Sequence, residues 1–157
     1  MIRASTATGV VPDVVRCLSL DFKFPGDLIY VLGETRDELG GSEYYEMMGY
    51  VGLQVPRFRG DQERGHYLAL QEAIGQGLVS AAHGIYRGGL GIHLTLMALG
   101  GDLGLEVDLS RVPASPGLRP DKLLFSETCG RVILTVDPQK QEAFEGLMAG
   151  CICRQVG

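Results

Sequence analysis

The chain has 157 residues, of which 45% are hydrophobic and 21% are charged, and this fits one globular domain with a real core. Its formal net charge of −5 argues against nucleic acid as a partner, because an acidic chain repels the phosphate backbone. No apolar run approaches the ~20 residues of a membrane span, and the opening residues lack the apolar core of a secretion signal. We therefore expect a cytoplasmic protein without membrane association.

The first part of the chain predicts two strands joined by a tight turn. Val14 to Leu20 is rich in β-forming residues, and Leu28 to Leu32 is continuously apolar, as in a strand buried on both faces. Between them, Phe24 to Asp27 contains the Pro-Gly pair of a turn. This arrangement resembles a hairpin.

Two helices are expected next. Ser42 can cap a short helix over Glu43 to Met48, and Val51 to Phe58 then reads as a loop. Asp61 to Leu78 has the clearest helical period, with apolar residues recurring every four positions and Asp61 placed to be the N-cap.

The second half alternates strands and helices. The expected segments are a strand over Val79 to His83, a helix over Gly88 to Leu99 stopped by Gly100-Gly101, a half-buried strand over Leu103 to Leu109, a loop over Arg111 to Pro120, a strand over Arg131 to Val136, a helix from Asp137-Pro138 to Gly150, and a strand over Cys151 to Val156. The whole pattern predicts an α+β (α/β layered) domain, in which helices cover one mixed β-sheet.

Titratable side chains offer few self-contained sites. His66 reads as a solvated side chain and His93 as a satisfied buried or boundary histidine. His83 stands at a strand-to-glycine turn, which is either a tight turn with a bonded histidine or an anion site at a helix N-terminus. Cys151 and Cys153 would point to one face of a strand, as small structural side chains.

Acidic residues allow two readings as well. Glu127 precedes a strand, where it either binds a ligand hydroxyl or metal or is simply exposed. Two acidic pairs, Asp37-Glu38 and Glu43-Glu46, lie near glycines, where they either hold Mg²⁺ with a phosphate or form a solvated face. The chain contains no P-loop, dinucleotide-binding glycine motif, zinc-protease motif or nucleophile elbow.

Four segments together resemble one family. GDLIYVLGETRDELGGSEY (26–44), GLVSAAHGIYRGGLGIHLTLMAL (77–99), LLFSETCGRVILTV (123–136) and the opening VVPDVVRCLSLDFKFPGD are similar, in order and spacing, to segments of phosphoribosylformylglycinamidine synthases. The first segment is the specific one. The resemblance is to a C-terminal domain of the aminoimidazole ribonucleotide synthase type, in the second of two tandem domain pairs.

This resemblance carries expectations about function. Synthases of this family use ATP, Mg²⁺ and glutamine-derived ammonia to convert formylglycinamide ribonucleotide to formylglycinamidine ribonucleotide in purine biosynthesis. The expected partners are the N-terminal domains of the same synthase and a glutaminase subunit or domain, with a homodimer also open. Because the catalytic groups of the family belong to N-terminal domains, we expect no turnover by this chain alone.

The turn after His83 departs from the family pattern. Gly84 and Arg87 stand where the family usually has aspartates, so a Mg²⁺ site here would lose oxygen ligands. Arg87 is expected to meet any phosphate directly, without metal. No residue is expected to be catalytic or metal-binding. The residues expected to lie near a nucleotide are Gly40, Gly41, Ser42, Glu43, His83, Arg87, Gly88, Gly89 and Glu127.

Two other readings stay open. The chain is alternatively a stand-alone binding or regulatory module that kept the fold and lost the site. It is also compatible with a domain of another superfamily member, of the aminoimidazole ribonucleotide synthase or selenophosphate synthetase type.

Overall fold

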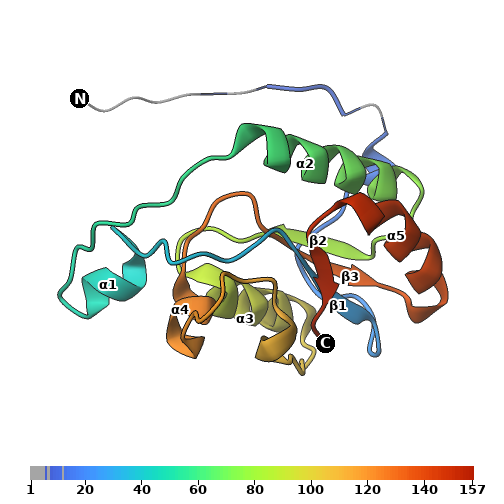
Figure 1. The fold of residues 1–157 in the computed structure, drawn as a ribbon. Coiled ribbons are helices and arrows are strands. Elements are labelled where there is room, and N and C mark those ends of the chain that lie inside the picture. The colour runs from blue at the N-terminus through green and yellow to red at the C-terminus, as the bar shows by residue number, and fades with distance from the viewer. Residues whose placement is uncertain (1–5, 7, 12) are drawn as a thin grey trace.

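The computed structural model describes residues 6, 8–11 and 13–157, which form a four-stranded sheet between two helical layers (Figure 1). The strands follow the order β2-β3-β1-β4, and each neighbouring pair is antiparallel. Parallel pairing in the described residues is confined to the isolated bridge between Thr35 and Ala114. The elements are η1 (Val14–Arg16), β1 (Leu28–Leu32), α1 (Glu43–Met47), α2 (Gly60–Gly75), β2 (Ala81–Gly84), α3 (Gly89–Gly101), η2 (Leu109–Arg111), α4 (Pro120–Phe125), β3 (Val132–Val136), η3 (Pro138–Lys140), α5 (Gln141–Leu147), η4 (Met148–Gly150) and β4 (Cys153–Gln155).

The central strands are apolar on both faces, as the continuous run in β1 predicts. Alternate residues of β1 enter different cores: Ile29 and Val31 pack on one face, and Tyr30 and Leu32 on the other. Figure 1 shows α3 and α4 on one side of the sheet and α2 and α5 on the other. This three-layer arrangement confirms the predicted fold class, in which helices cover a sheet, although the sheet is antiparallel where a mixed one was expected.

Each layer contributes an apolar stripe to its core. The first core takes its helical residues from α3 and α4: Leu90, Leu94, Met97 and Leu123. The second takes them from α2, α5 and η4: Ala69, Leu70, Ala73, Ile74, Phe144 and Met148. Phe144 is fully buried and meets Tyr30 edge-on, with ring centroids 4.8 Å apart.

The two strands predicted at Val14 to Leu20 and Leu103 to Leu109 are absent from the structure. Val14 and Val15 are 77% and 87% exposed, and Asp13 caps a 3-10 turn there by accepting from the Val15 amide (3.0 Å). Because these side chains meet no partner, the local cap decides the conformation. The hairpin expected between this segment and β1 is therefore wrong, although the turn at 24–27 forms, with Asp27 N–H donating to Phe24 C=O (3.3 Å).

The segment predicted as a strand over Leu103 to Leu109 is loop and the start of η2. Asp108 caps η2 by accepting from the Ser110 amide (2.9 Å), and its own N–H donates to Val156 C=O (2.7 Å). Leu103, Val107 and Leu109 pack against the first core without forming a ladder, and Leu105 is 39% exposed. Apolar alternation alone thus misidentified a packed loop as a strand.

Helix positions differ from expectation at several places, and α3 includes Gly100 and Gly101, which were expected to stop it. The N-cap of α2 is Arg59 and not Asp61, and the helix ends at Gly75, before Leu78. Glu63 takes over part of the capping by accepting from the Arg59 amide (3.0 Å). The short helix α4, with proline at its first turn, was not predicted. The predicted cap of α1 is confirmed: Ser42 Oγ accepts from the Tyr45 amide (3.3 Å).

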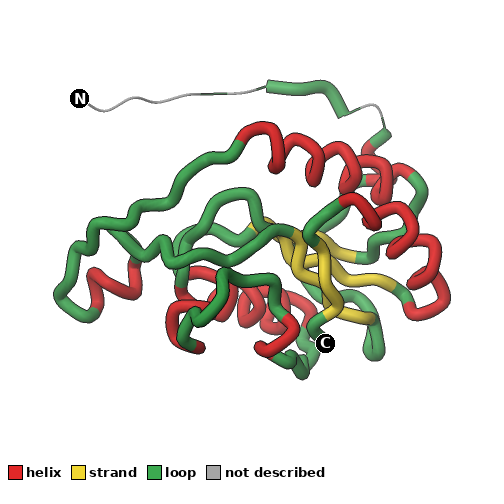
Figure 2. The backbone as a smooth tube through the Cα atoms, in the orientation of Figure 1, coloured by secondary structure: helices red, strands yellow, loops and turns green. Residues whose placement is uncertain are grey.

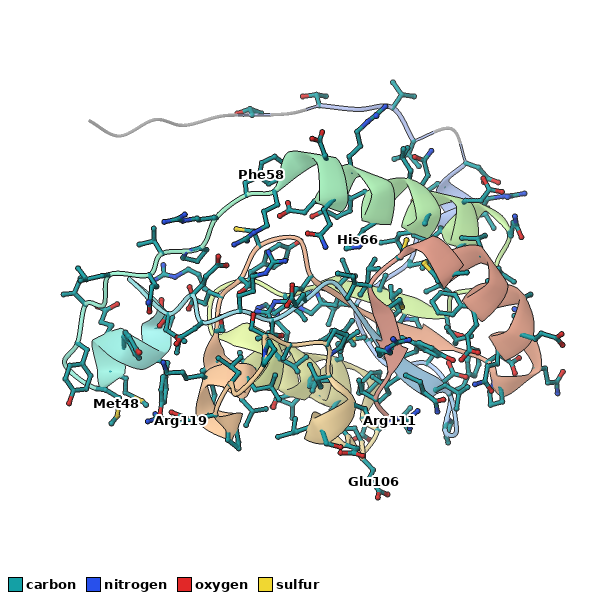
Figure 3. All side chains as sticks on the ribbon, in the orientation of Figure 1. Met48, Phe58, His66, Glu106, Arg111 and Arg119 are labelled. Carbon is teal, nitrogen blue, oxygen red and sulfur yellow. The ribbon has the colours of Figure 1, made fainter. Side chains whose placement is uncertain are left out.

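An arm leaves the body between β1 and α2. Figure 2 shows it as a long loop interrupted by α1, and Figure 3 shows Met48 at its far end and Phe58 where it rejoins α2. Both side chains are exposed, at 53% and 74%. No helix of the described residues is long and apolar enough to cross a bilayer.

Candidate functional site

The two glycines of the Gly40–Glu43 segment close the base of the arm. Gly40 N–H donates to Gln54 C=O (2.8 Å), and Gly41 N–H donates to Val51 C=O (2.7 Å). A side chain at Gly40 would lie 2.8 Å from the Gln54 backbone, so the close approach requires glycine. These amides bind the returning chain of the arm, and they are not free to bind a phosphate.

Two histidines organise the turn after β2. Tyr86 N–H donates to His93 Nε2 (2.9 Å), and His93 Nδ1 lies 2.8 Å from His83 Nε2. Because Nε2 of His93 accepts, its Nδ1 carries the proton and donates to His83. The contact from Nε2 to the Arg87 carbonyl is longer, at 3.2 Å, and using it as a donor would leave the Tyr86 amide unpaired. Burial lowers the pKa of both histidines, and for His93 the neighbouring His83 adds to the effect.

The His93 expectation is therefore confirmed, and His83 joins the turn as its bonded partner. His66 is different from its expectation. It belongs to α2 and is only 5% exposed, so the prediction of a solvated side chain is wrong. Gly65 and Tyr67 flank it in sequence, and nothing in that pattern marks its burial.

Gly88 and Gly89 then start α3 in a conformation that other residues rarely adopt. Their φ angles are +90° and +71°, and a Cβ on Gly89 would lie 2.6 Å from the Leu124 carbonyl oxygen. The pair lets the chain reverse tightly between β2 and α3 while α3 packs against α4. Gly89 N–H donates to Tyr86 C=O (3.1 Å), which leaves Gly88 N–H to find a partner outside the turn.

Glu127 supplies that partner. One of its oxygens, Oε1, accepts from Gly88 N–H (2.8 Å) and from Glu43 N–H (3.0 Å), so the carboxylate joins the N-termini of α3 and α1. Beside it, the Arg87 guanidinium forms an ion pair with the Glu43 carboxylate. We call this set, Glu127 with Gly88, Glu43 and Arg87, the Glu127 bridge. An internal carboxylate here takes the place that an anionic ligand would take at helix N-termini.

The structure thus brings together most of the residues predicted to lie near a nucleotide. Glu43, Arg87, Gly88 and Glu127 are in direct contact, and Gly89 adjoins them. Gly40, Gly41 and Ser42 lie just behind, at the base of the arm, whereas His83 is linked through His93. Their role as nucleotide neighbours remains a prediction.

Two of the other acidic side chains considered for Mg²⁺ are held by cations. Asp37 pairs with Lys122 (2.6 Å), and the buried Glu38 pairs with Arg59 (2.7 Å). In the described part of the chain, no three His, Cys, Asp or Glu side chains gather as a metal site would need. These carboxylates join loops to one another.

A cavity of about 540 Å³ opens beside the Glu127 bridge, between α2 and the edge strand β2. That volume lies in the range of small-molecule pockets. Its walls include His83, Arg87 and Glu127, together with two tyrosines, Tyr67 and Tyr86, that are 48% and 65% exposed. Sequence reasoning did not single out the tyrosines, because they lie on a helix face and in a turn without a recognisable motif.

Arg131 was also missed, although it holds the loops around the site. It is 2% exposed, and it donates from Nε to Thr128 C=O (3.0 Å) and from Nη1 to Thr35 Oγ1 (2.9 Å), with a further bond to Ser126 C=O. Burial lowers its pKa to about 10, because the interior disfavours the charged form. An arginine just before a strand gives no sign in the sequence of such complete burial.

The cysteine expectation holds in outline. Both Cys151 and Cys153 are free and half-buried against the same core, although only Cys153 belongs to β4. Burial raises the pKa of the Cys153 thiol to about 12 and also raises that of Cys151. Neither thiol is poised to react as a thiolate.

Sequence comparison matches residues 25–157 to the family described as AIR synthase related protein, C-terminal domain. Among curated relatives, the phosphoribosylformylglycinamidine synthase subunit PurL of Thermococcus sibiricus is 40% identical over 129 residues, which are 82% of this chain and 18% of the relative. The PurL subunit of Methanocaldococcus jannaschii is 42% identical over 134 residues, 84% of this chain and 18% of the relative. The chain thus spans about a fifth of the length of these relatives.

Solved structures share the fold. Thermotoga maritima PurL complexed with FGAR superposes with a TM-score of 0.79 at 23% identity, over 91% of this chain and 25% of that one. Thiamine-monophosphate kinase from Stenotrophomonas maltophilia superposes with a TM-score of 0.61 at 21% identity, over 90% of this chain and 50% of that one. The same layered domain therefore recurs in enzymes with different names.

Proposed function

Since this chain belongs to the family of AIR synthase-related C-terminal domains, we propose that it serves as the C-terminal domain of a phosphoribosylformylglycinamidine synthase. That enzyme would use ATP and glutamine-derived ammonia to convert formylglycinamide ribonucleotide to formylglycinamidine ribonucleotide. Support comes from curated relatives of that name at about 40% identity, each several times longer than this chain.

Within that enzyme we assign the chain a supporting role and no turnover of its own. The observation that carries this is the Glu127 bridge. The Glu127 carboxylate already accepts hydrogen bonds from the Gly88 and Glu43 amides, and the Glu43 carboxylate is already paired with Arg87. A site whose donors are satisfied from within is suited to joining loops, and a neighbouring domain would supply the reacting groups.

A nucleotide would meet this chain through Arg87. Thermotoga maritima PurL has been described in complex with ATP, with ADP and with AMPPCP. Here the exposed Arg87 side chain, at 72%, can exchange Glu43 for a phosphate oxygen. Mg²⁺ fits poorly, because Gly84 and Arg87 offer no carboxylate at the turn and Glu43 and Glu127 are already engaged.

The proposed partners are the N-terminal domains of the same synthase and a glutaminase subunit, in the cytoplasm. The Thermotoga maritima complex PurLQS supports assembly of this kind. Apolar side chains exposed on the arm, such as Met47, Val51 and Leu53, support a face that another domain covers. When the chain is separate, the same face would favour a homodimer, which light scattering over a concentration series would reveal.

Reconstitution tests the assignment. The 157-residue chain is combined with a synthase that lacks the corresponding domain, and ammonia-dependent formation of formylglycinamidine ribonucleotide is measured. We expect turnover from the mixture and none from either part alone. Turnover by this chain alone, or an assembled mixture without activity, would contradict the proposal.

Calorimetry tests the phosphate contact. ADP is titrated into the reconstituted synthase with and without Mg²⁺, for the parent and for Arg87→Ala. We expect the binding assigned to this turn to persist without Mg²⁺ and to weaken in Arg87→Ala. Binding that vanishes without Mg²⁺ and ignores the substitution would overturn the contact, while leaving the assignment of the domain standing.

A further inference from the structure

A second cavity, far smaller than the first, lies under the first half of α2. Its volume is about 10 Å³, and it adjoins the loops that carry Gly33 and Gly130. Figure 3 shows His66 on the side of α2 that faces the sheet. Glu63, one helical turn before His66, lines the same cavity. The space is too small for an organic ligand and matches one water-sized molecule.

Both side chains end in atoms that lack a partner among the described residues. Glu63 and His66 are only 6% and 5% exposed, and Glu63 Oε2 and His66 Nδ1 form no hydrogen bond. Buried polar atoms in folded proteins are nearly always paired, by protein or by ordered water. Two unpaired atoms at one cavity therefore point to a bound molecule.

The remaining atoms of these side chains determine what that molecule must offer. Glu63 Oε1 accepts from the Arg59 amide (3.0 Å), and His66 Nε2 accepts from the Ile152 amide (3.3 Å). Because Nε2 accepts, the proton of the neutral ring lies on Nδ1. Burial lowers the pKa of His66, which favours that neutral form. The unpartnered atoms of these two lining residues are thus one donor, Nδ1–H, and one acceptor, Oε2.

We propose that this cavity holds one internal water molecule, which accepts from His66 Nδ1–H and donates to Glu63 Oε2. Water matches both groups at once. An ammonium or metal cation would meet the Nδ1–H donor, and an anion would meet the Glu63 carboxylate. The neutral molecule with both functions is the one that satisfies the site.

The water completes a connection between α2 and two distant segments. Through His66, α2 is bonded to Ile152, whose C=O in turn accepts from Gly33 N–H (2.7 Å). Gly130 closes the other side: a Cβ there would lie 2.6 Å from the Glu63 carboxyl carbon. Because Gly130 also has a φ of +75°, a larger residue there would be strained and would displace the Glu63 carboxylate.

Crystallography of the 157-residue chain tests the site directly. We expect a density peak within hydrogen-bond distance of both Glu63 Oε2 and His66 Nδ1. In crystals soaked in rubidium chloride, we expect no anomalous signal at the peak. An empty cavity, or a rubidium signal there, would overturn the proposal.

Nitrogen NMR of the histidine side chains provides a second measurement in solution. We expect His66 as the neutral Nδ1–H form, with cross-relaxation between that proton and a long-lived water. A ring protonated on Nε2 would refute the proposed geometry.

Two substitutions separate the water from general packing. Glu63→Gln keeps an oxygen for the Arg59 amide and offers an N–H to the water, so the peak should persist. His66→Phe removes the donor, so the peak should be lost and the melting temperature should fall. Retention of the peak in His66→Phe contradicts the proposal, and if that variant does not fold, the parent crystals and the tautomer still decide.

Discussion

Replacing Glu127 by alanine removes an acceptor that serves the first turns of both α3 and α1. Loss of a helix cap costs about 0.5–2 kcal/mol. The lost bonds are charge-assisted, and they include the one from Gly88 N–H to Glu127 Oε1 (2.8 Å). Because α1 is short and lies on the arm, its loss is mainly local. We therefore expect Glu127→Ala to reduce the free energy of global unfolding by about 2 kcal/mol, or a melting temperature lower by roughly 4–8 °C.

Urea unfolding followed by circular dichroism measures this effect, and amide hydrogen exchange locates it. Glu127→Gln keeps an acceptor oxygen and should lose about half as much. Glu106→Ala is the matched control, because Glu106 is exposed and projects away from the body in Figure 3; it should stay within about 0.5 kcal/mol of the parent. The Gly88 and Glu43 amides should exchange faster in Glu127→Ala alone. If that variant matches the control and both amides keep their rates, the Glu127 bridge does not hold the helices.

Three further predictions concern the same end of the molecule. Gly89→Ala should destabilise the fold by about 3 kcal/mol or more, because it combines a positive φ with a backbone clash. The control Gly26→Ala, at positive φ in open space, should cost about 1–2 kcal/mol. Urea unfolding measures both, and equal costs would refute the clash. Burial lowers the pKa of His83 and His93 below 6.5, so the unfolded chain binds more protons than the folded chain at mildly acidic pH. The stability of the fold should be full above pH ~6.5 and should fall as the pH drops through the folded pKa values. Urea midpoints that stay flat from pH 7.5 to 5 would contradict this. Arg131→Met should cost about 3 kcal/mol by leaving buried carbonyls unpaired, and Arg131→Lys should rescue little of it; a neutral Arg131→Met would show that the network contributes nothing net.

The layered fold was predictable because its central strands carry strong local signals. The apolar run of β1 and the strand β3 need no partner to be recognised, and the caps at Ser42 and Asp137 mark helix starts by chemistry that acts within three residues. The segments at 14–20 and 103–109 are rich in apolar residues, as the strands are, yet they lie outside the sheet. Whether an apolar segment pairs or packs as a loop depends on which strand edge is free, and that is a property of the whole chain.

The tight turns of the candidate site were predictable from the sequence, whereas the side-chain hydrogen bonds that join them were not. Paired glycines correctly indicated tight turns, and the family resemblance placed Glu127 and Arg87 among them. That Glu127 turns inward to two helix N-termini follows from how α1, α3 and α4 pack, which local sequence does not encode. The burial of His66 and Arg131 has the same origin, because each is covered by segments more than sixty positions away.

The two edges of the sheet determine how readily copies of this chain can aggregate by pairing strand to strand. On the β2 side, the Ala82 amide donates to Ser19 C=O (3.4 Å), so the stretch once expected to be a strand shields the edge without joining it. On the other side, β4 is only three residues long. Exposed strand edges recruit other strands into aggregates, and short or covered edges resist this. Substitutions that straighten residues 17–21 into a true strand should therefore leave a new, longer edge and promote fibril formation.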